Sequence, residues 1–310
     1  MPIACMPRPP ATRARPAESG GSMLRVGICL LFGVMALVGC VRLPGMKGSS
    51  QQARPAAFPQ GDEAQTETTG LPLALATEDD YVVRVVAGKV TCSGALIEED
   101  RVLTAHHCLA VRGRGGEMLP EDVSAEEVRV ELGGDHFAWG EVGVKAVLAP
   151  TCGYAAGDGD IAILVLERRL VGVPTRKLRL DERPAMGQEL EPVGFGRCFN
   201  SGAMRRMVRE GGSIDVVMDT RFRLDASICP GDSGGPIVDK EHGEIVGVIS
   251  QAVMDGNEKT RGRAEFTRVD AWRELFTQAK FVSDGMSPNE LPPVECPKSP
   301  AKVTNPARSR

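Results

Sequence analysis

The stretch GDSGGP at residues 231–236 places Ser233 between small residues. Glycines on both sides of a serine let the backbone turn tightly and let a substrate carbonyl approach main-chain N–H groups. Such a turn exposes a hydroxyl that can serve as a nucleophile. A serine hydroxyl is weak at neutral pH and needs a base, so the positions of the histidines decide whether this turn carries chemistry.

Only four histidines occur in the chain, and two of them, His106 and His107, stand in LTAHHC at residues 103–108. A third motif, GDIAIL at residues 159–164, places Asp160 at the start of a strongly apolar segment. An unpaired charge would be costly there, and an imidazole N–H is a suitable partner for the carboxylate. Three candidate groups for acid–base and nucleophilic chemistry are therefore present.

The texture of residues 81–281 is that of an all-β protein. Short β-rich runs such as YVVRVVAG, VTCSGALI and DIAILVL are separated by Gly, Asp, Pro and Asn, and a second series starts near residue 187. Many short strands at regular spacing predict sandwiches or barrels, and two series suggest two barrels. The last periodic segment, residues 269–279, predicts one terminal helix. Its apolar face would consist of Val269, Trp272, Leu275, Phe276 and Ala279.

Together the three motifs resemble those of the chymotrypsin/trypsin family of serine proteases, and they occur in the family's order of His, Asp and Ser. The resemblance covers about residues 81–279. It implies two packed six-stranded antiparallel β-barrels with an active site in the cleft between them, followed by a C-terminal helix. It also implies that Ser233 attacks the scissile carbonyl, His107 transfers the proton and Asp160 orients the imidazole.

Further roles follow from the same resemblance. The backbone N–H groups of Gly231 and Ser233 would receive the oxyanion, and Ser250 matches the family serine behind the aspartate. His107 is preferred as the base because the family's histidine directly precedes a cysteine. His106 stands where alanine is usual, and we interpret it either as a surface residue or as one that supports the site without contacting the substrate. Asp158 is interpreted as an ordinary turn aspartate.

By resemblance, the substrate-binding residues would be Ser227, Ser250, Ala252 and Ala264. Ser227 occupies the pocket base in place of the aspartate of trypsins, which argues against a strict Arg/Lys preference. Ala252 and Ala264 align with the pocket walls, where methyl groups would favour small or medium apolar side chains. Asp225 is a competing candidate for the pocket base if the loop is shifted, and basic side chains would then fit.

Nine cysteines are many for a cytosolic protein, and six of them would remain besides those of the expected signal region, an even number that is typical of a disulfide set in an exported chain. The resemblance pairs Cys92 with Cys108, which would fix the histidine loop, and makes a bridge between Cys198 and Cys229 plausible. Cys152 and Cys296 are left over, and a bridge between them is a weaker expectation. No cofactor or metal is expected.

Activation departs from the family pattern. In trypsin-like zymogens a new N-terminus, usually Ile-Val-Gly-Gly, pairs with the aspartate just before the catalytic serine, and no such tetrapeptide precedes Tyr81. Either cleavage frees an atypical terminus, or another group orders the oxyanion loop, or the enzyme is poorly active. A buried, unpaired aspartate would be expensive, so Asp232 should have a partner.

The N-terminal region resembles a bacterial lipoprotein signal peptide. An uncharged apolar stretch at residues 26–39 follows Arg25, is too short to span a membrane, and ends in LVGC with Cys40 as the expected lipid-attachment site. An ordinary signal peptide or a short anchor helix is the alternative, and Met23 is a possible true start. Residues 1–40 are thus assigned to the signal region, 41–80 to a flexible tether and 81–281 to the peptidase domain. The Pro-rich tail, residues 282–310, is expected to be extended or disordered.

Composition narrows the partners. The 310-residue chain has a formal net charge of -4, so no basic surplus exists to bind nucleic acid. We expect a monomer that acts on protein or peptide substrates and contacts the membrane only through its lipid anchor, with the outer membrane favoured. The leading function is a serine endopeptidase. The alternative is a weakly active or inactive protease-like lipoprotein that binds or senses.

Overall fold

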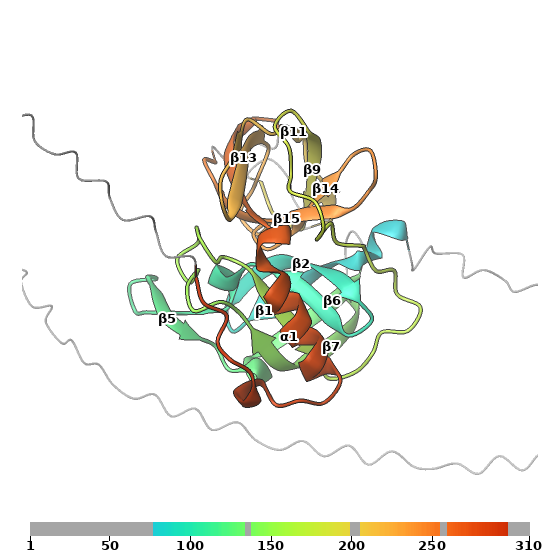
Figure 1. Cartoon of the computed structure of the whole chain (residues 1–310), viewed down its shortest axis with the longest axis vertical. Helices are drawn as coiled ribbons and strands as arrows, with labels where there is room; N and C mark the ends of the chain where they lie inside the picture. Colours follow the sequence, from blue (N-terminus) through green and yellow to red (C-terminus); the bar gives the residue numbers. More distant parts are fainter. Residues whose placement is uncertain (1–76, 134–137, 199–204, 255–258, 297–310) are drawn as a thin grey trace, which may run out of the picture. The chain divides into compact units, whose positions relative to one another are not determined.

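The computed structural model describes residues 77–133, 138–198, 205–254 and 259–296, all of which belong to one compact unit (Figure 1). The expected signal region, the lipid site Cys40 and the tether up to residue 76 lie outside the described residues. Within the described ranges, none of the helices has the length and apolar character needed to cross a membrane.

Six strands of the first half close into an antiparallel barrel in the order β1-β2-β3-β8-β7-β6. Val85 illustrates the closure, because it pairs with Cys92 on one side and Val130 on the other. The barrel strands are β1 (Val82–Ala87), β2 (Val90–Glu98), β3 (Arg101–Thr104), β6 (Val128–Gly133), β7 (Ala138–Leu148) and β8 (Ala162–Leu166). A separate hairpin is formed by β4 (Ala110–Arg112) and β5 (Met118–Asp122), and short 3₁₀ turns occupy η1 (Glu78–Tyr81), η2 (His106–Cys108) and η3 (Ala125–Glu127).

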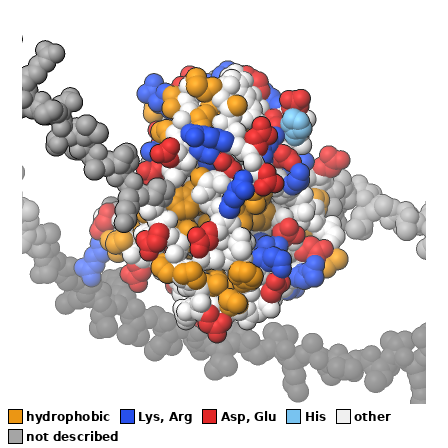
Figure 2. Space-filling model, in the orientation of Figure 1, with side chains coloured by type: hydrophobic (Ala, Val, Ile, Leu, Met, Phe, Trp, Pro, Cys, Tyr) orange, Lys and Arg blue, Asp and Glu red, His pale blue; other side chains and the backbone are white. Residues whose placement is uncertain are grey.

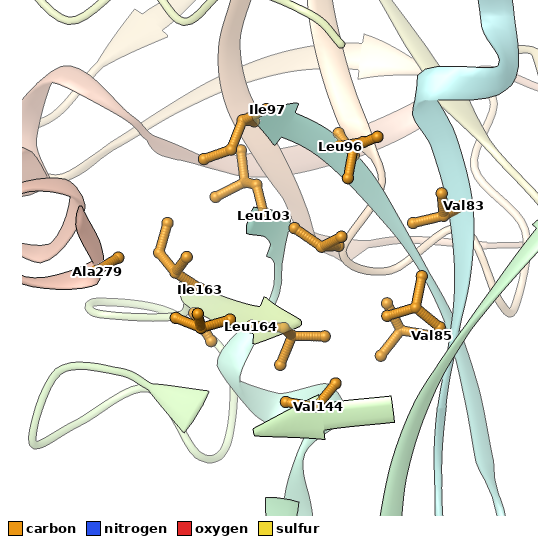
Figure 3. Close-up of a cluster of buried hydrophobic side chains, with 14 of the residues drawn as sticks. Val83, Val85, Leu96, Ile97, Leu103, Val144, Ile163, Leu164 and Ala279 are labelled. Carbon is orange, nitrogen blue, oxygen red and sulfur yellow. The ribbon is translucent and has the colours of Figure 1, made fainter. Parts of the chain in front are cut away.

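Strand β8 is buried along its whole length, which explains its unbroken apolar sequence AILVL. One face of the strand contributes to the barrel interior, and helix α1 (Arg273–Ser283) packs against the same strand from outside. Figure 3 shows Ala279 of α1 on the side of Ile163, while side chains of β1, β2, β3 and β7 fill the barrel. A strand covered on both faces leaves no position for a polar side chain.

The second half is an antiparallel sheet of eight short strands in the order β10-β9-β14-β15-β16-β13-β12, with β11 also paired to β9. β11 and β12 follow each other in the chain, yet one pairs with β9 and the other with β13, so residues 212–217 join the two sides of the sheet. The strands are β9 (Glu189–Gly194), β10 (Met207–Val208), β11 (Gly212–Ser213), β12 (Val216–Val217), β13 (Arg221–Ala226), β14 (Pro236–Asp239), β15 (Ile245–Ala252) and β16 (Gly262–Arg268).

The chymotrypsin-like fold class is therefore confirmed, with one difference in detail. The expected second six-stranded barrel is a curled sheet of eight strands, three of which contain only two residues. Gly211 shows why pairing is interrupted: a Cβ at this position would lie 1.9 Å from the carbonyl oxygen of Leu190. Such a close approach to β9 admits only glycine, and glycine is a weak strand former.

Each half has its own buried apolar cluster. The first fills the barrel and extends under α1, and also includes Val193, Phe195 and Val248 from the second half. The second lies inside the curled sheet, where the rings of Phe222 and Phe266 stack with centroids 5.3 Å apart. Because the first cluster draws side chains from both halves, the halves are joined by apolar packing.

The terminal helix is confirmed, but its α-helical part runs from residue 273 to 283 instead of from 269 to 279. A 3₁₀ turn, η4 (Asp270–Trp272), leads into α1, and the predicted apolar face is entirely buried. The chain then continues in a defined path through η5 (Pro288–Glu290) as far as Cys296, where the sequence suggested an extended or disordered tail. Burial of Val294 and the disulfide between Cys152 and Cys296 give this segment its place.

Charged side chains of both signs are interspersed on the face drawn in Figure 2. The carboxylate of Asp239, at the end of β14, is buried and accepts hydrogen bonds from Arg179, His242 and the amide of Glu241. Burial raises the pKa of Asp239, but these donors outweigh it and hold the pKa at about 2.

Substituting Asp239→Asn should therefore lower the free energy of unfolding by about 2 kcal/mol at pH 7. The folded-state pKa is depressed, so the stabilisation is present above pH 4 and is lost as the pH falls towards 2. Urea unfolding of the wild type and the variant at pH 7 and at about pH 2 measures both values. A difference that stayed constant over this range would contradict the expectation.

Candidate active site

His107 and Asp160 are brought together by neighbouring strands of the barrel. Thr104, the last residue of β3, pairs with Ala162, the first residue of β8. His107 follows three residues after Thr104 in turn η2, and Asp160 stands two residues before Ala162. A disulfide between Cys92 of β2 and the residue after the histidine ties η2 to the barrel.

The carboxylate of Asp160 is fully buried and accepts hydrogen bonds from two positions of one residue. His107 Nδ1 lies 2.8 Å from Oδ2, and the backbone N–H of His107 donates to Oδ1 at 2.9 Å. The hydroxyl of Ser250, on β15, also donates to Oδ2. The imidazole is therefore fixed with Nδ1 towards the carboxylate, which leaves Nε2 as the nitrogen available for proton transfer.

Ser233 lies half-buried in the loop between β13 and β14, and Ser93 of β2 connects that loop to the barrel. The N–H of Ser93 donates to the carbonyl of Ser233 at 2.8 Å, and its hydroxyl donates to the carbonyl of Gly231 at 2.8 Å. The same hydroxyl accepts from the N–H of Phe195 at 2.8 Å. One buried side chain thus holds two segments of the second half against the first.

Gly234 places the serine loop directly beside the histidine loop. Its φ is +81°, and a Cβ there would lie 2.3 Å from Thr104 Oγ1 and 3.0 Å from the amide nitrogen of Ala105. Only glycine tolerates this conformation and this approach. Ser233 is therefore followed directly by a glycine that packs against Thr104 and Ala105, and Ala105 lies two residues before His107.

The amide groups around the serine are arranged for a ligand. Within the described ranges, neither the N–H of Gly231 nor that of Ser233 donates to a protein acceptor. Gly231 has a φ of +99°, a value that L-residues rarely adopt. Two unengaged N–H groups next to a serine hydroxyl are an arrangement that could bind an oxyanion.

Asp232, between these two residues, has the partner that the sequence required but did not identify. Arg209 donates from Nε to Oδ2 at 2.8 Å and from an η-nitrogen to Oδ1 at 3.1 Å. Both side chains are buried, with 2% and 0% exposed. Burial raises the pKa of Asp232, and the Arg209 guanidinium together with the amides of Cys229 and Gly196 opposes that rise. Sequence reasoning missed both Arg209 and Ser93.

His106 is not a surface residue, so that part of the sequence interpretation was wrong. Its side chain is fully buried, with Nδ1 2.5 Å from the carbonyl oxygen of Cys152 and Nε2 3.0 Å from Asp122. Its ring packs against Tyr154, with centroids 4.2 Å apart. His106 thus supports the turn behind His107, which agrees with its interpretation as a supporting residue.

The candidate pocket residues lie near one another on the second sheet. Ala252 and Ala264 are direct partners across the β15–β16 ladder, and Ser227 is buried immediately after β13. Asp225 is exposed on β13, whereas its neighbours Leu224 and Ala226 are buried. Asp225 therefore sits on the face opposite to the buried side of the strand.

The remaining sequence-derived assignments are placed as follows. Disulfides join Cys92 to Cys108, Cys152 to Cys296, and Cys198 to Cys229, which confirms all three expected bridges. Cys92, Cys108 and His107 also lie close enough to suggest metal ligands, but both sulfurs are in the disulfide and offer no thiolate. Asp158 binds Thr220 and Arg221 at the surface, as a turn aspartate would.

Comparisons with known proteins agree on one group. A family model described as Trypsin matches residues 70–274. The chain is 29% identical over 224 residues to serine protease SP24D of Anopheles gambiae, covering 66% of this chain and 76% of that protein. It is 26% identical to a trypsin of Sarcophaga bullata, over 51% and 67% of the two chains, and 25% identical to trypsin iota of Drosophila melanogaster, over 61% and 81%.

Proposed function

Because the chain belongs to the trypsin family of serine proteases, we propose that it is an endopeptidase in which Ser233, His107 and Asp160 form the catalytic triad. The observation that carries this proposal is the buried hydrogen bond of 2.8 Å between His107 Nδ1 and Asp160, next to a serine loop with two unengaged amides. Protein or peptide substrates follow from the family.

In the proposed reaction, Ser233 Oγ attacks the scissile carbonyl carbon while His107 Nε2 accepts the hydroxyl proton. The oxyanion receives hydrogen bonds from the N–H groups of Gly231 and Ser233. His107 then returns the proton to the leaving amine, which breaks the C–N bond and leaves an acyl-enzyme. Water, deprotonated by the same imidazole, attacks the acyl carbon; the ester bond to Ser233 then breaks, the acid leaves and the imidazole returns the proton to Ser233 Oγ. Asp160 keeps the imidazole in the required tautomer and stabilises its charged form.

For specificity we propose a pocket based on Ser227 and narrowed by the methyl groups of Ala252 and Ala264. The exposed position of Asp225 supports Ser227 as the base, since an acidic base would have to face the buried side of β13. A neutral, narrow pocket selects small or medium apolar side chains over Arg and Lys.

We also propose that the enzyme is exported and lipid-anchored at Cys40 in the cell envelope, with the outer membrane favoured, and that it is a monomer. Three disulfides, one of which joins the peptidase domain to the segment that follows it, support an oxidising compartment. The lipobox sequence supports the anchor.

A fluorophosphonate probe tests the proposal directly. We expect it to label the wild type and to leave Ser233→Ala unlabelled, because only an activated serine reacts with the probe. Ser287→Ala, on the exposed C-terminal segment, is the matched control and should be labelled like the wild type. The adduct should map to the peptide containing Ser233. A wild type that stays unlabelled, both intact and after cleavage ahead of residue 77, would instead indicate a protease-like binding protein.

A further inference from the structure

Asp232 is held by four hydrogen bonds that leave no place for another donor of the same kind. Two come from Arg209, at 2.8 and 3.1 Å, and two come from the amides of Gly196, at 2.6 Å, and Cys229, at 2.9 Å. A carboxylate has about four acceptor positions, so this one is saturated. The η-nitrogen of Arg209 that contacts Oδ1 also donates to the carbonyl of Gly196, and the other η-nitrogen contacts the sulfur atoms of Cys198 and Met207.

The backbone around the pair fits this arrangement closely. A Cβ on Gly194 or Gly196 would lie 2.4 Å from the side chain of Asp232, so both glycines let β9 approach the carboxylate. Asp232 is flanked by Gly231 and Ser233, whose amides are the unengaged pair described above. Whatever fixes the Asp232 side chain therefore also fixes the direction of those two N–H groups.

The segment that contains Arg209 also contacts residues 77–80, which lie just ahead of strand β1. Arg206, three residues before Arg209, donates to Asp80 at 2.6 Å and to the Thr77 hydroxyl at 2.7 Å. The Thr77 N–H itself donates to Asp80 at 2.7 Å. Among the described residues, Thr77 contacts Asp80 and Arg206, and no contact joins it to Asp232.

We propose that Arg209 is a built-in positioning residue that takes the place of a free N-terminal amine beside Asp232, so that the enzyme is active without cleavage of its N-terminal segment. The inference rests on the proposed peptidase function. In this proposal the Arg209 guanidinium orders the loop that carries Asp232 and Ser233, for which the sequence alone did not identify a partner. The domain can accordingly work while still joined to the chain ahead of residue 77.

The first test uses the wild-type protein with its N-terminal segment intact, confirmed by intact-mass spectrometry. We expect the uncut chain to react with the fluorophosphonate probe at Ser233 and to gain less than twofold in labelling rate after limited cleavage ahead of residue 77. Labelling that appears only after cleavage would overturn the inference while leaving the peptidase function standing. Absence of labelling in both forms would reject the proposed function itself.

The second test uses pH, which distinguishes the two kinds of cation. A free α-amine titrates at about 8 and lysine at about 10.4, whereas arginine stays protonated above pH 12. The wild-type acylation rate should therefore stay level from pH 8 to about 10.5, and Arg209→Lys should acquire an alkaline decline in that range. A decline shared equally by both proteins would contradict the inference.

The third test removes the cation. Arg209→Gln should lower kcat by about 10²–10³-fold with a smaller change in KM, the loss expected when oxyanion donors are misplaced. Arg206→Gln is the matched control, because it removes another buried arginine–aspartate contact from the same segment. It should keep a wild-type kcat and a level pH profile. An Arg209→Gln variant with a wild-type kcat would overturn the inference, and the two wild-type tests remain decisive if this variant does not fold.

Discussion

Replacing Asp160 with asparagine should lower kcat about 10⁴-fold with little change in KM. The carboxylate accepts from the Nδ1 and backbone N–H of His107 and from the Ser250 hydroxyl, all at a site with no solvent exposure. An amide has one acceptor oxygen and one donor nitrogen, so it cannot satisfy these donors. The imidazole would adopt the tautomer whose Nε2 already carries a proton, and this form cannot act as a base.

Steady-state hydrolysis of a peptide substrate measures the effect. Asp158→Asn is the matched control, since Asp158 lies two residues away and its side chain is 56% exposed. It should retain wild-type kcat. Ser250→Ala removes one donor and leaves both contacts with His107, so its loss should be far smaller than that of Asp160→Asn. A decrease of less than tenfold for Asp160→Asn would exclude Asp160 from the proposed role.

Removing the bridge between Cys152 and Cys296 should give the largest loss of stability. The two cysteines are 144 residues apart in sequence, and the chain-entropy model gives about 4–5 kcal/mol for closing a loop of this order. The double variant Cys152→Ser, Cys296→Ser should therefore unfold at a much lower denaturant concentration, and its Tm should fall by about 10 °C or more.

The bridge between Cys92 and Cys108 provides the comparison. Its cysteines are only 16 residues apart, so its removal should cost about 3 kcal/mol and less than removal of the long-range bridge. Denaturant unfolding of the two double variants, at equal pH and ionic strength, gives both values. Equal losses, or a larger loss for the short loop, would show that local strain or residual structure outweighs chain entropy at these sites.

The sequence predicted correctly those features whose residues lie close together in the chain. The histidine, aspartate and serine motifs each consist of a few adjacent residues, and the apolar spacing of residues 269–279 predicted α1 because helical packing repeats within the segment itself. The three disulfides could be expected because six cysteines remain after the signal region, and family resemblance supplied two of the pairings. The fold class followed from these features.

What the sequence could not provide depends on partners far away in the chain. Arg209 stands in MVREGG, where nothing marks it as the partner of Asp232, 23 residues further on. Ser93 looks like an ordinary strand residue until the serine loop lies against it. For His106 the sequence could not decide between a surface position and a supporting one, because its three contacts, with Cys152, Asp122 and Tyr154, come from other segments. The curl of the second sheet likewise depends on residues 212–217 reaching both sides.

The three hydrogen bonds of Ser93 connect the two halves of the domain at a single side chain and its backbone N–H. They bind the serine loop and Phe195, which directly follows β9, to the barrel that carries His107 and Asp160. The proposed nucleophile and base therefore stay aligned only while these hydrogen bonds are intact. A shift of about 1 Å between the serine loop and the barrel would misalign the groups proposed to react, and displacements of that size are enough to cost about 10²-fold in rate. On heating, we accordingly expect enzymatic activity to be lost at a lower temperature than the one at which the domain unfolds.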